Sequence, residues 1–205
     1  MNKKENPSKQ EFKNPGVEYR SAPFWSLNDD LDDKELQHQL LEMKKGGMGG
    51  GFMHSRIGLI TPYLSKEWMD RIKNTVAYAK KIGLLAYLYD EDRWPSGFAG
   101  GIVTKKRLNQ MKLLQGKKKN GNWTFKETIS PKSEWYNDSY YLNTMNRRAV
   151  GAFIKSTYDA YKNVVGKEFN KTVPAIFTDE PNYFNPFGDN KSQQIPWTEN
   201  LASEF

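Results

Sequence analysis

The chain has no cysteine and only two histidines among its 205 residues. The absence of cysteine excludes disulfides, thiolate catalysis and zinc sites built on thiolates. The two histidines, His38 and His54, are too few for a histidine-rich metal centre. Any metal would therefore be a hard cation on oxygen ligands, and the sequence itself requires no cofactor.

Long apolar runs are also absent. No segment reaches the roughly 18 consecutive apolar residues of a membrane span, and the first 16 residues lack the apolar segment of a signal peptide. We therefore expect no membrane contact and a cytoplasmic location, with a processed extracellular form left open. The chain is 37% hydrophobic and 14% aromatic, enough for the core of one domain or of most of a larger one.

The net charge of +7 would suit a scaffold that binds nucleic acid. The basic residues, however, are scattered in small groups near predicted helix ends and in a predicted turn, such as Lys44-Lys45, Lys80-Lys81 and Lys117-Lys118-Lys119. A solvated surface explains such groups. We therefore expect no nucleic-acid partner and keep that function as a third alternative.

Segments typical of strands and helices alternate after a polar leader over residues 1–16. Strand-like segments cover residues 18–27, 50–56, 84–91 and 173–181, and helix-like segments run from Asp32 to Lys45, from Ser65 to Ile82 and from Val150 to Val165. The continuous apolar character of residues 84–91 indicates a strand buried on both faces. Alternating strands and helices predict an α/β fold with a parallel sheet.

Both a doubly wound open sheet and a (β/α) barrel fit this order. Polar and aromatic residues follow every predicted strand, which favours the barrel because a barrel site draws on many strand ends. We therefore predict a partial (β/α)8 TIM-type barrel of about four βα units over residues 17–205. Asn120-Gly121 is a strong hairpin signal and indicates a small β-rich insertion over about residues 102–142.

A complete barrel needs about 250 residues, so we expect this chain to be the N-terminal half of a longer protein. The remainder of that protein, or self-association, would cover the edges of the sheet. The glycine run over residues 46–52 follows a helix and precedes a strand, which is the reverse of a dinucleotide-binding loop. We interpret this run as a helix stop with close strand packing.

The segment TDEP, residues 178–181, provides the predicted catalytic residues, Asp179 and Glu180. A carboxyl group at the end of a buried strand can have a raised pKa, as a general acid requires. Because strand side chains alternate, only one of the two acids would face the mouth of the sheet, and we assign Glu180 to it. The alternative is that both acids cap the following loop.

The segment LYDEDRWPSGFAGG, residues 88–101, provides candidate substrate contacts: Tyr89, Asp90, Glu91, Asp92 and Trp94. Carboxylates accept hydrogen bonds from sugar hydroxyls, and an indole packs on the apolar face of a sugar ring. The glycine-containing loop after Trp94 would let the backbone approach a ligand closely. A solvated acidic loop with a core tryptophan is the alternative.

The ends of the first two strands add four further candidate substrate contacts. Trp25 and Asn28 end the first strand, and His54 and Arg56 end the second. Each alone is typical of a structural residue, but together with the acidic segments they predict one polar and aromatic rim.

Four segments together carry a family resemblance: PFWSLND, GGFMHSRIGLITPYLSKEWM, YLYDEDRWPSGFAGG and AIFTDEP. They resemble the N-terminal half of the catalytic barrel in large bacterial glycoside hydrolases, above all family 106, the α-L-rhamnosidases, and relatives described as family 2-like. The resemblance implies an exo-acting glycosidase that cuts a terminal sugar from plant or pectic oligosaccharides with two carboxylates, with inversion, and with calcium as an implied metal.

Within this resemblance Glu180 matches the acid on the fourth strand, and the partner carboxylate is expected beyond Phe205. Asp90 or Asp92 is the alternative for this partner. Inverting and retaining glycosidases differ in the separation of these two groups. The residues present therefore leave the stereochemical outcome open. A carbohydrate-binding half-barrel without catalysis is the alternative function, because the same rim could hold a sugar without cleaving it.

Overall fold

The structure, a computed structural model, describes residues 8–182 and 193–204. The chain forms two compact units. The first unit contains the residues up to Tyr89 together with Lys162–Phe177, and the second contains Asp90–Tyr161 together with the residues from Thr178 onward. These units do not follow the predicted leader over 1–16 or the predicted insertion over about 102–142, and those boundaries stay predictions.

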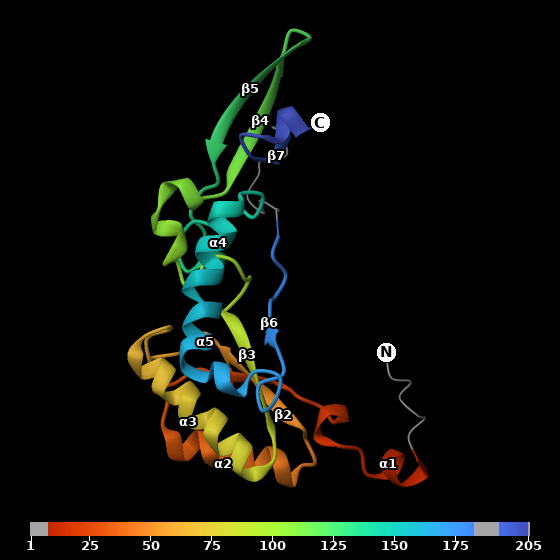
Figure 1. The fold of residues 1–205 in the computed structure, drawn as a ribbon. Coiled ribbons are helices and arrows are strands. Elements are labelled where there is room, and N and C mark those ends of the chain that lie inside the picture. The colour runs from red at the N-terminus through yellow and green to blue at the C-terminus, as the bar shows by residue number, and fades with distance from the viewer. Residues whose placement is uncertain (1–7, 183–192, 205) are drawn as a thin grey trace. The chain divides into compact units, whose positions relative to one another are not determined.

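The first unit is built on a four-stranded sheet with the order β1-β2-β3-β6 (Figure 1). Its strands are β1 (Phe24–Leu27), β2 (Gly50–Ser55), β3 (Leu85–Asp92) and β6 (Ile176–Phe177), with the last three residues of β3 in the second unit. β1 pairs in parallel with β2, and β3 pairs in parallel with β6. The predicted α/β class with a parallel sheet is confirmed, whereas no closure into a barrel occurs among the described residues.

Two helices of the first unit begin and end where the sequence predicts. In α2 (Asp33–Lys45) the Asp32 side chain accepts the N–H groups of the first turn, and in α3 (Lys66–Ile82) the Ser65 side chain does the same. Gly83 ends α3 with φ +76°, a left-handed conformation that glycine adopts without strain. The helices lie side by side against the sheet (Figure 1).

The two faces of this sheet differ. One face carries Trp25 and Met53, which are buried beside α2. The opposite face carries aromatic rings in mutual contact, namely Phe24, Phe52, His54, Tyr87, Tyr89 and Phe177. Along β3, Ala86 and Leu88 are buried, but Leu85 and Tyr87 are only half-buried. Burial on both faces is therefore wrong for the first half of this strand, because the helix layer packs on the face of Trp25.

The fourth strand is shorter and less buried than predicted. β6 contains only Ile176 and Phe177, both half-buried, within the predicted range 173–181. Glu180 has φ +44°, which departs from the extended conformation. Strand geometry therefore does not continue to the predicted catalytic pair.

The second unit contains the predicted hairpin and one strand that the sequence does not signal. β4 (Lys112–Lys119) and β5 (Asn122–Ile129) pair in antiparallel register around Asn120 and Gly121, whose φ values are +50° and +84°. This confirms the hairpin. β7 (Gln193–Trp197) pairs with the other edge of β4. The short helix α6 (Leu201–Glu204) follows β7.

The helix predicted over 150–165 is divided into α4 (Arg147–Ser156) and α5 (Tyr158–Val165). At the break, the hydroxyl of Thr157 donates to the carbonyl oxygen of Phe153 at 2.9 Å. The hydroxyl of Ser156 donates to the carbonyl oxygen of Ala152, also at 2.9 Å. Such side-chain bonds to the preceding turn bend helices. The core of this unit includes the buried side chains of Phe98, Met111, Leu113, Tyr136 and Tyr141.

Short helices complete the fold. They are α1 (Lys9–Lys13), within the predicted leader, and the single-turn 3₁₀ helices η1 (Val17–Tyr19), η2 (Val103–Lys105), η3 (Arg107–Asn109), η4 (Glu134–Tyr136) and η5 (Gly166–Glu168). Within the described ranges, no helix combines the length and the apolar character needed to traverse a bilayer.

Candidate functional site

The carboxyl end of β3 carries a fully buried acid, Asp90, held by three hydroxyl groups. Its Oδ1 accepts from Ser96 Oγ at 2.5 Å, and its Oδ2 accepts from Thr178 Oγ1 at 2.6 Å and from Tyr158 Oη at 2.7 Å. The two hydroxyl oxygens on Oδ2 are also 2.5 Å from each other. All four residues belong to the second unit and form one short hydrogen-bond network.

Burial sets the proton affinity of this network. It raises the pKa of the Asp90 carboxyl above its ordinary value, while the three hydroxyl donors act in the opposite direction. Burial also raises the pKa of the Tyr158 phenol. The network can therefore retain a proton at a pH at which an exposed aspartate is ionised, which is a property of general acids.

Three separate segments bring the hydroxyls to Asp90. Ser96 follows Trp94-Pro95 in the loop after β3, and Thr178 follows β6 directly. Tyr158 is the first residue of α5, so the break at Thr157 decides where its side chain points. The break between α4 and α5 therefore helps to place the Tyr158 hydroxyl beside Asp90.

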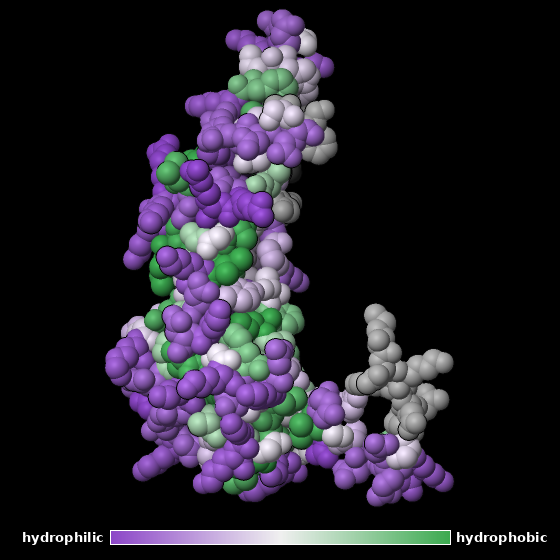
Figure 2. All heavy atoms as spheres, viewed as in Figure 1, coloured by the Kyte–Doolittle hydropathy of each residue, from purple (hydrophilic) through white to green (hydrophobic). Residues whose placement is uncertain are grey.

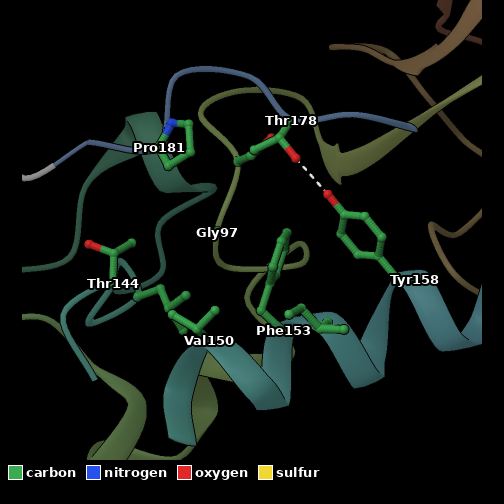
Figure 3. Close-up of a pocket in the computed structure, with 10 residues that line it drawn as sticks. Gly97, Thr144, Val150, Phe153, Tyr158, Thr178 and Pro181 are labelled. Atoms are coloured by element: carbon green, nitrogen blue, oxygen red, sulfur yellow. Dashed lines mark hydrogen bonds between the residues drawn. The ribbon is translucent and has the colours of Figure 1, made fainter. Parts of the chain in front are cut away.

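A pocket of about 480 Å³ lies beside this network in the second unit (Figure 3). Ser96, Tyr158 and Thr178 form its polar side, and α4 contributes Val150 and Phe153 to an apolar wall. The remaining lining residues are Gly97, Leu142, Thr144, Ile154 and Pro181. In Figure 3 the Tyr158 side chain points from α5 toward Thr178, and Phe153 rises from α4 below them. The pocket can therefore hold a ligand with one apolar side and hydroxyl groups at one end.

Glu91 is also fully buried, but the surrounding loop encloses its carboxylate. Oε1 accepts the N–H groups of Asp92 and Gly100 at 2.8 and 2.6 Å. Oε2 accepts those of Gly97, Phe98 and Ala99 at 2.9, 2.8 and 2.8 Å. Burial raises the pKa of Glu91 to about 8, and the N–H donors oppose this shift.

These contacts give Glu91 a structural role, because its side chain holds the loop that follows β3. The loop predicted to approach a ligand with its backbone instead directs five N–H groups at this side chain. The sugar contact predicted for Glu91 therefore has no support from its position, because both oxygens are already engaged inside the unit.

The same loop is tied to the segment that carries the predicted catalytic acids. The N–H of Ser96 donates to the carbonyl oxygen of Asp179 at 2.8 Å, and the N–H of Asp179 donates to Ser96 Oγ at 2.9 Å. The Tyr141 hydroxyl donates to the carbonyl oxygen of Ser96 and accepts the N–H of Asn182 at 3.2 Å. The structure thus brings the segments of Asp90 and Asp179 together.

The predicted general acid, Glu180, is exposed, and Asp179 is half-buried. With φ +44°, Glu180 lies outside the regular alternation that assigned it to the mouth of the sheet. The premise of a buried strand end is therefore wrong for Glu180, although its catalytic role stays a prediction. Asp92 and Trp94 are half-buried; Asp92 accepts from Asn137 at 3.1 Å, and Trp94 contacts the ring of Trp135.

The candidate substrate contacts in the first unit are divided into buried and exposed side chains. His54 and Tyr89 are buried, with ring centroids 3.7 Å apart. Trp25 is also buried, and its indole N–H donates to Gln39 of α2 at 2.5 Å, so it packs toward the helices and lies away from a rim. Asn28 and Arg56 are exposed. One rim shared by these residues and the acids of the second unit stays a prediction.

The described part of the chain shows no cluster of side chains for the metal implied by the family resemblance. Across residues 8–182 and 193–204, no group of three or more histidine and carboxylate side chains is arranged to hold a metal ion. We therefore assign no step of the chemistry to calcium.

Sequence reasoning missed three members of the network: Ser96, Tyr158 and Thr178. Tyr158 follows the apolar helical spacing of Val150 and Ile154 and therefore resembles a core residue. Its hydroxyl is the only signal of another role, since a buried tyrosine hydroxyl needs a hydrogen-bond partner.

The fold is that of a mixed α/β protein with a parallel sheet and a buried carboxyl site in its second unit. No family model matches the chain, and no curated protein matches it. Among solved structures, the chain is similar to a rhamnosidase from Novosphingobium sp. PP1Y, with 22% identity and a TM-score of 0.41. The match covers 54% of this chain and 11% of that chain, so the chain spans a small part of that protein.

Proposed function

We propose that this chain supplies a sugar-binding pocket to a glycoside hydrolase. The observation that carries the proposal is the network of the buried Asp90 and Ser96 with Tyr158 and Thr178, at the polar end of a pocket with an apolar wall. A sugar ring has the matching character, because it presents hydroxyl groups at its edges and C–H groups on its faces.

The pocket suggests how a sugar would bind. The oxygens of Tyr158 and Thr178 have lone pairs that can accept from sugar hydroxyls, and the ring of Phe153 can pack on the apolar face of the sugar. Asp90 fixes both hydroxyls in place, so that little rotational freedom is lost on binding. Asp90 is thus a positioning residue.

The reaction that we propose is hydrolysis of a terminal O-glycosidic bond, with an α-L-rhamnoside as the first candidate substrate. Glu180 would protonate the leaving oxygen, with Asp179 beside it, and the second carboxylate would come from outside these residues. The strand order β1-β2-β3-β6 places consecutive strands side by side, as in a (β/α) barrel, and supports the proposal that the sheet is part of one.

Two measurements test the proposal. Titration of the chain with L-rhamnose and other monosaccharides, followed by NMR, should show saturable binding that Phe153→Ala and Tyr158→Phe weaken. Tyr140→Phe, a half-buried tyrosine outside the pocket, is the matched control. Absence of saturable binding, or binding that neither pocket variant changes, would contradict the pocket.

Hydrolysis is tested separately on a longer protein that contains these residues together with the second carboxylate, with phenyl glycosides, whose leaving oxygen requires protonation. Glu180→Gln should reduce the rate by about 10²–10⁴-fold, as expected for the loss of a general acid. Full activity in this variant would show that another group protonates the leaving oxygen.

A second candidate function is sugar binding without turnover. It is favoured by the exposure of Glu180 and by the complete engagement of both Asp90 oxygens with hydroxyl donors. Saturable binding of a monosaccharide by this chain, combined with no release of aglycone from any aryl glycoside by the longer protein, would select this function over hydrolysis.

A further inference from the structure

The hairpin of β4 and β5 carries an aromatic surface that the pocket does not use. Trp123 and Phe125 are 43% and 65% exposed. Their rings are 12° from parallel, with centroids 6.1 Å apart. Large exposed aromatic side chains on a hairpin add little to folding, since they remain in contact with water. They therefore suggest a binding role.

The strand register defines which side chains share this surface. In antiparallel pairs, side chains of directly opposite residues lie on the same face. Trp123 lies opposite Lys118, and Phe125 lies opposite Gly116. A Cβ atom on Gly116 would lie 3.3 Å from each of the two rings, so the absence of a side chain there lets both rings lie over the strand. We call Gly116, Lys118, Trp123 and Phe125 the aromatic face.

The charge around this face is positive. Lys118 Nζ lies 5.9 Å from the centroid of the Trp123 ring. Lys117, Lys119 and Lys126 lie on the opposite face by strand alternation. Within the described ranges, none of these four lysines has a carboxylate in ion-pair contact, and the hairpin acid Glu127 is engaged by Lys112 at 2.8 Å. In Figure 2 the end of the hairpin is covered mainly by hydrophilic residues with a small hydrophobic area among them.

We propose that the aromatic face binds a polysaccharide of uronic acids, as a second site that holds polymeric substrate. The inference rests on the proposed function for its choice of sugar. Each uronic acid ring has an apolar C–H face for Trp123 and Phe125 and a carboxylate for Lys118, so the ligand matches both the rings and the charge. Single-stranded nucleic acid also combines flat rings with negative charge. The experiment below therefore includes it as an alternative ligand.

The test measures binding of the whole chain to sodium polygalacturonate by calorimetry at low and at high salt. We expect binding that weakens with salt. Replacing both rings, Trp123→Ala with Phe125→Ala, should weaken it by about tenfold or more. Fully methyl-esterified polygalacturonate keeps the sugar rings but loses the charge, so it should bind more weakly than the acid form.

Matched variants locate the site. Lys118→Gln should weaken binding more than Lys126→Gln, which removes the same charge from the opposite face of the ribbon. Phe12→Ala, which removes an exposed ring from α1, should leave binding unchanged. Undiminished binding by the double aromatic variant, or equal effects of the two lysine variants, would overturn the aromatic face as the site.

Two further outcomes bear on the occupant and on the proposed function. If oligothymidylate binds more tightly than polygalacturonate, and this binding is lost in the double aromatic variant, the ligand of the aromatic face is nucleic acid and not a polysaccharide. Phe153→Ala should leave polymer binding unchanged, and the double aromatic variant should leave monosaccharide binding in the pocket unchanged. The two proposals can therefore fail independently.

Discussion

The backbone N–H of Ala99 donates to Glu91 Oε2 at 2.8 Å, in a loop that closes around the side chain of a residue eight positions earlier. Ala99 has φ +51°, and Gly97 and Gly100 also have positive φ values. This conformation directs successive N–H groups inward, as in the backbone concavities that bind anions. The carboxyl group of Glu91 occupies this concavity.

We expect Glu91→Ala to destabilise the second unit. It removes the acceptor of five N–H groups, and buried donors without acceptors are costly. The free energy of unfolding should fall by about 3 kcal/mol, as measured by urea denaturation. Glu134→Ala, at an exposed position of the same unit, should change it little. Equal effects of the two variants would contradict the anchoring role.

The contribution of Glu91 to the free energy of unfolding should decrease as the pH rises. The pKa of Glu91 is raised from 4.5 to about 8 in the folded protein, so the folded form holds this proton more tightly than the unfolded form. The contribution is complete below pH 4.5 and is lost as the pH rises through about 8, by at most about 5 kcal/mol.

Urea denaturation between pH 4.5 and pH 9 measures this effect. Glu91→Gln has no titrating group at this position and should show a flatter profile. If the free energy of unfolding of the protein, relative to that of Glu91→Gln, does not fall with pH in this window, the N–H donors prevail over burial and Glu91 is ionised throughout.

Tyr158→Phe should weaken the hydrogen-bond network at Asp90 without unfolding the chain. The variant removes a hydroxyl that donates to Asp90 and contacts Thr178. Loss of one hydrogen bond to a buried carboxyl costs about 1–3 kcal/mol, and the pKa of Asp90 should rise further, since this bond lowers it. NMR titration of the Asp90 carboxyl measures the shift. An unchanged titration in Tyr158→Phe, matching that of Tyr140→Phe, would exclude the contact.

Two glycines with open space around them should respond oppositely to alanine. Gly83 ends α3 with φ +76°, whereas Gly151 lies inside α4, and no atom within 4 Å would meet a Cβ at either position. Gly83→Ala should cost about 1 kcal/mol because of its positive φ, and Gly151→Ala should stabilise by about 0.5–1 kcal/mol. Thermal unfolding of both variants provides the comparison, and shifts of the same sign would contradict it.

The predictions that succeeded depended on local signals. Asp32, Ser65 and Gly83 cap helices through atoms within a few residues of the chain, and Asn120-Gly121 turns a hairpin by its own backbone preference. Such features are readable from sequence because their partners lie nearby.

The errors arose where a signal needed distant partners. Residues 84–91 are apolar enough for burial on both faces, but the position of the helix layer decided that Leu85 and Tyr87 are only half-buried. β7 pairs with β4 although its sequence contains proline, and its Pro196 lies on the edge of the sheet, where a missing N–H is tolerated.

The sequence by itself determined the α/β class, the capped helices and the presence of acids behind the third strand. Only the tertiary structure decided what those acids do. The hydroxyl partners of Asp90 lie 6, 68 and 88 positions away along the chain, whereas Glu91 is satisfied by the loop that follows it. Adjacent carboxylates of similar chemistry therefore acquired different roles, because burial makes each depend on whichever donors the fold brings within 3 Å.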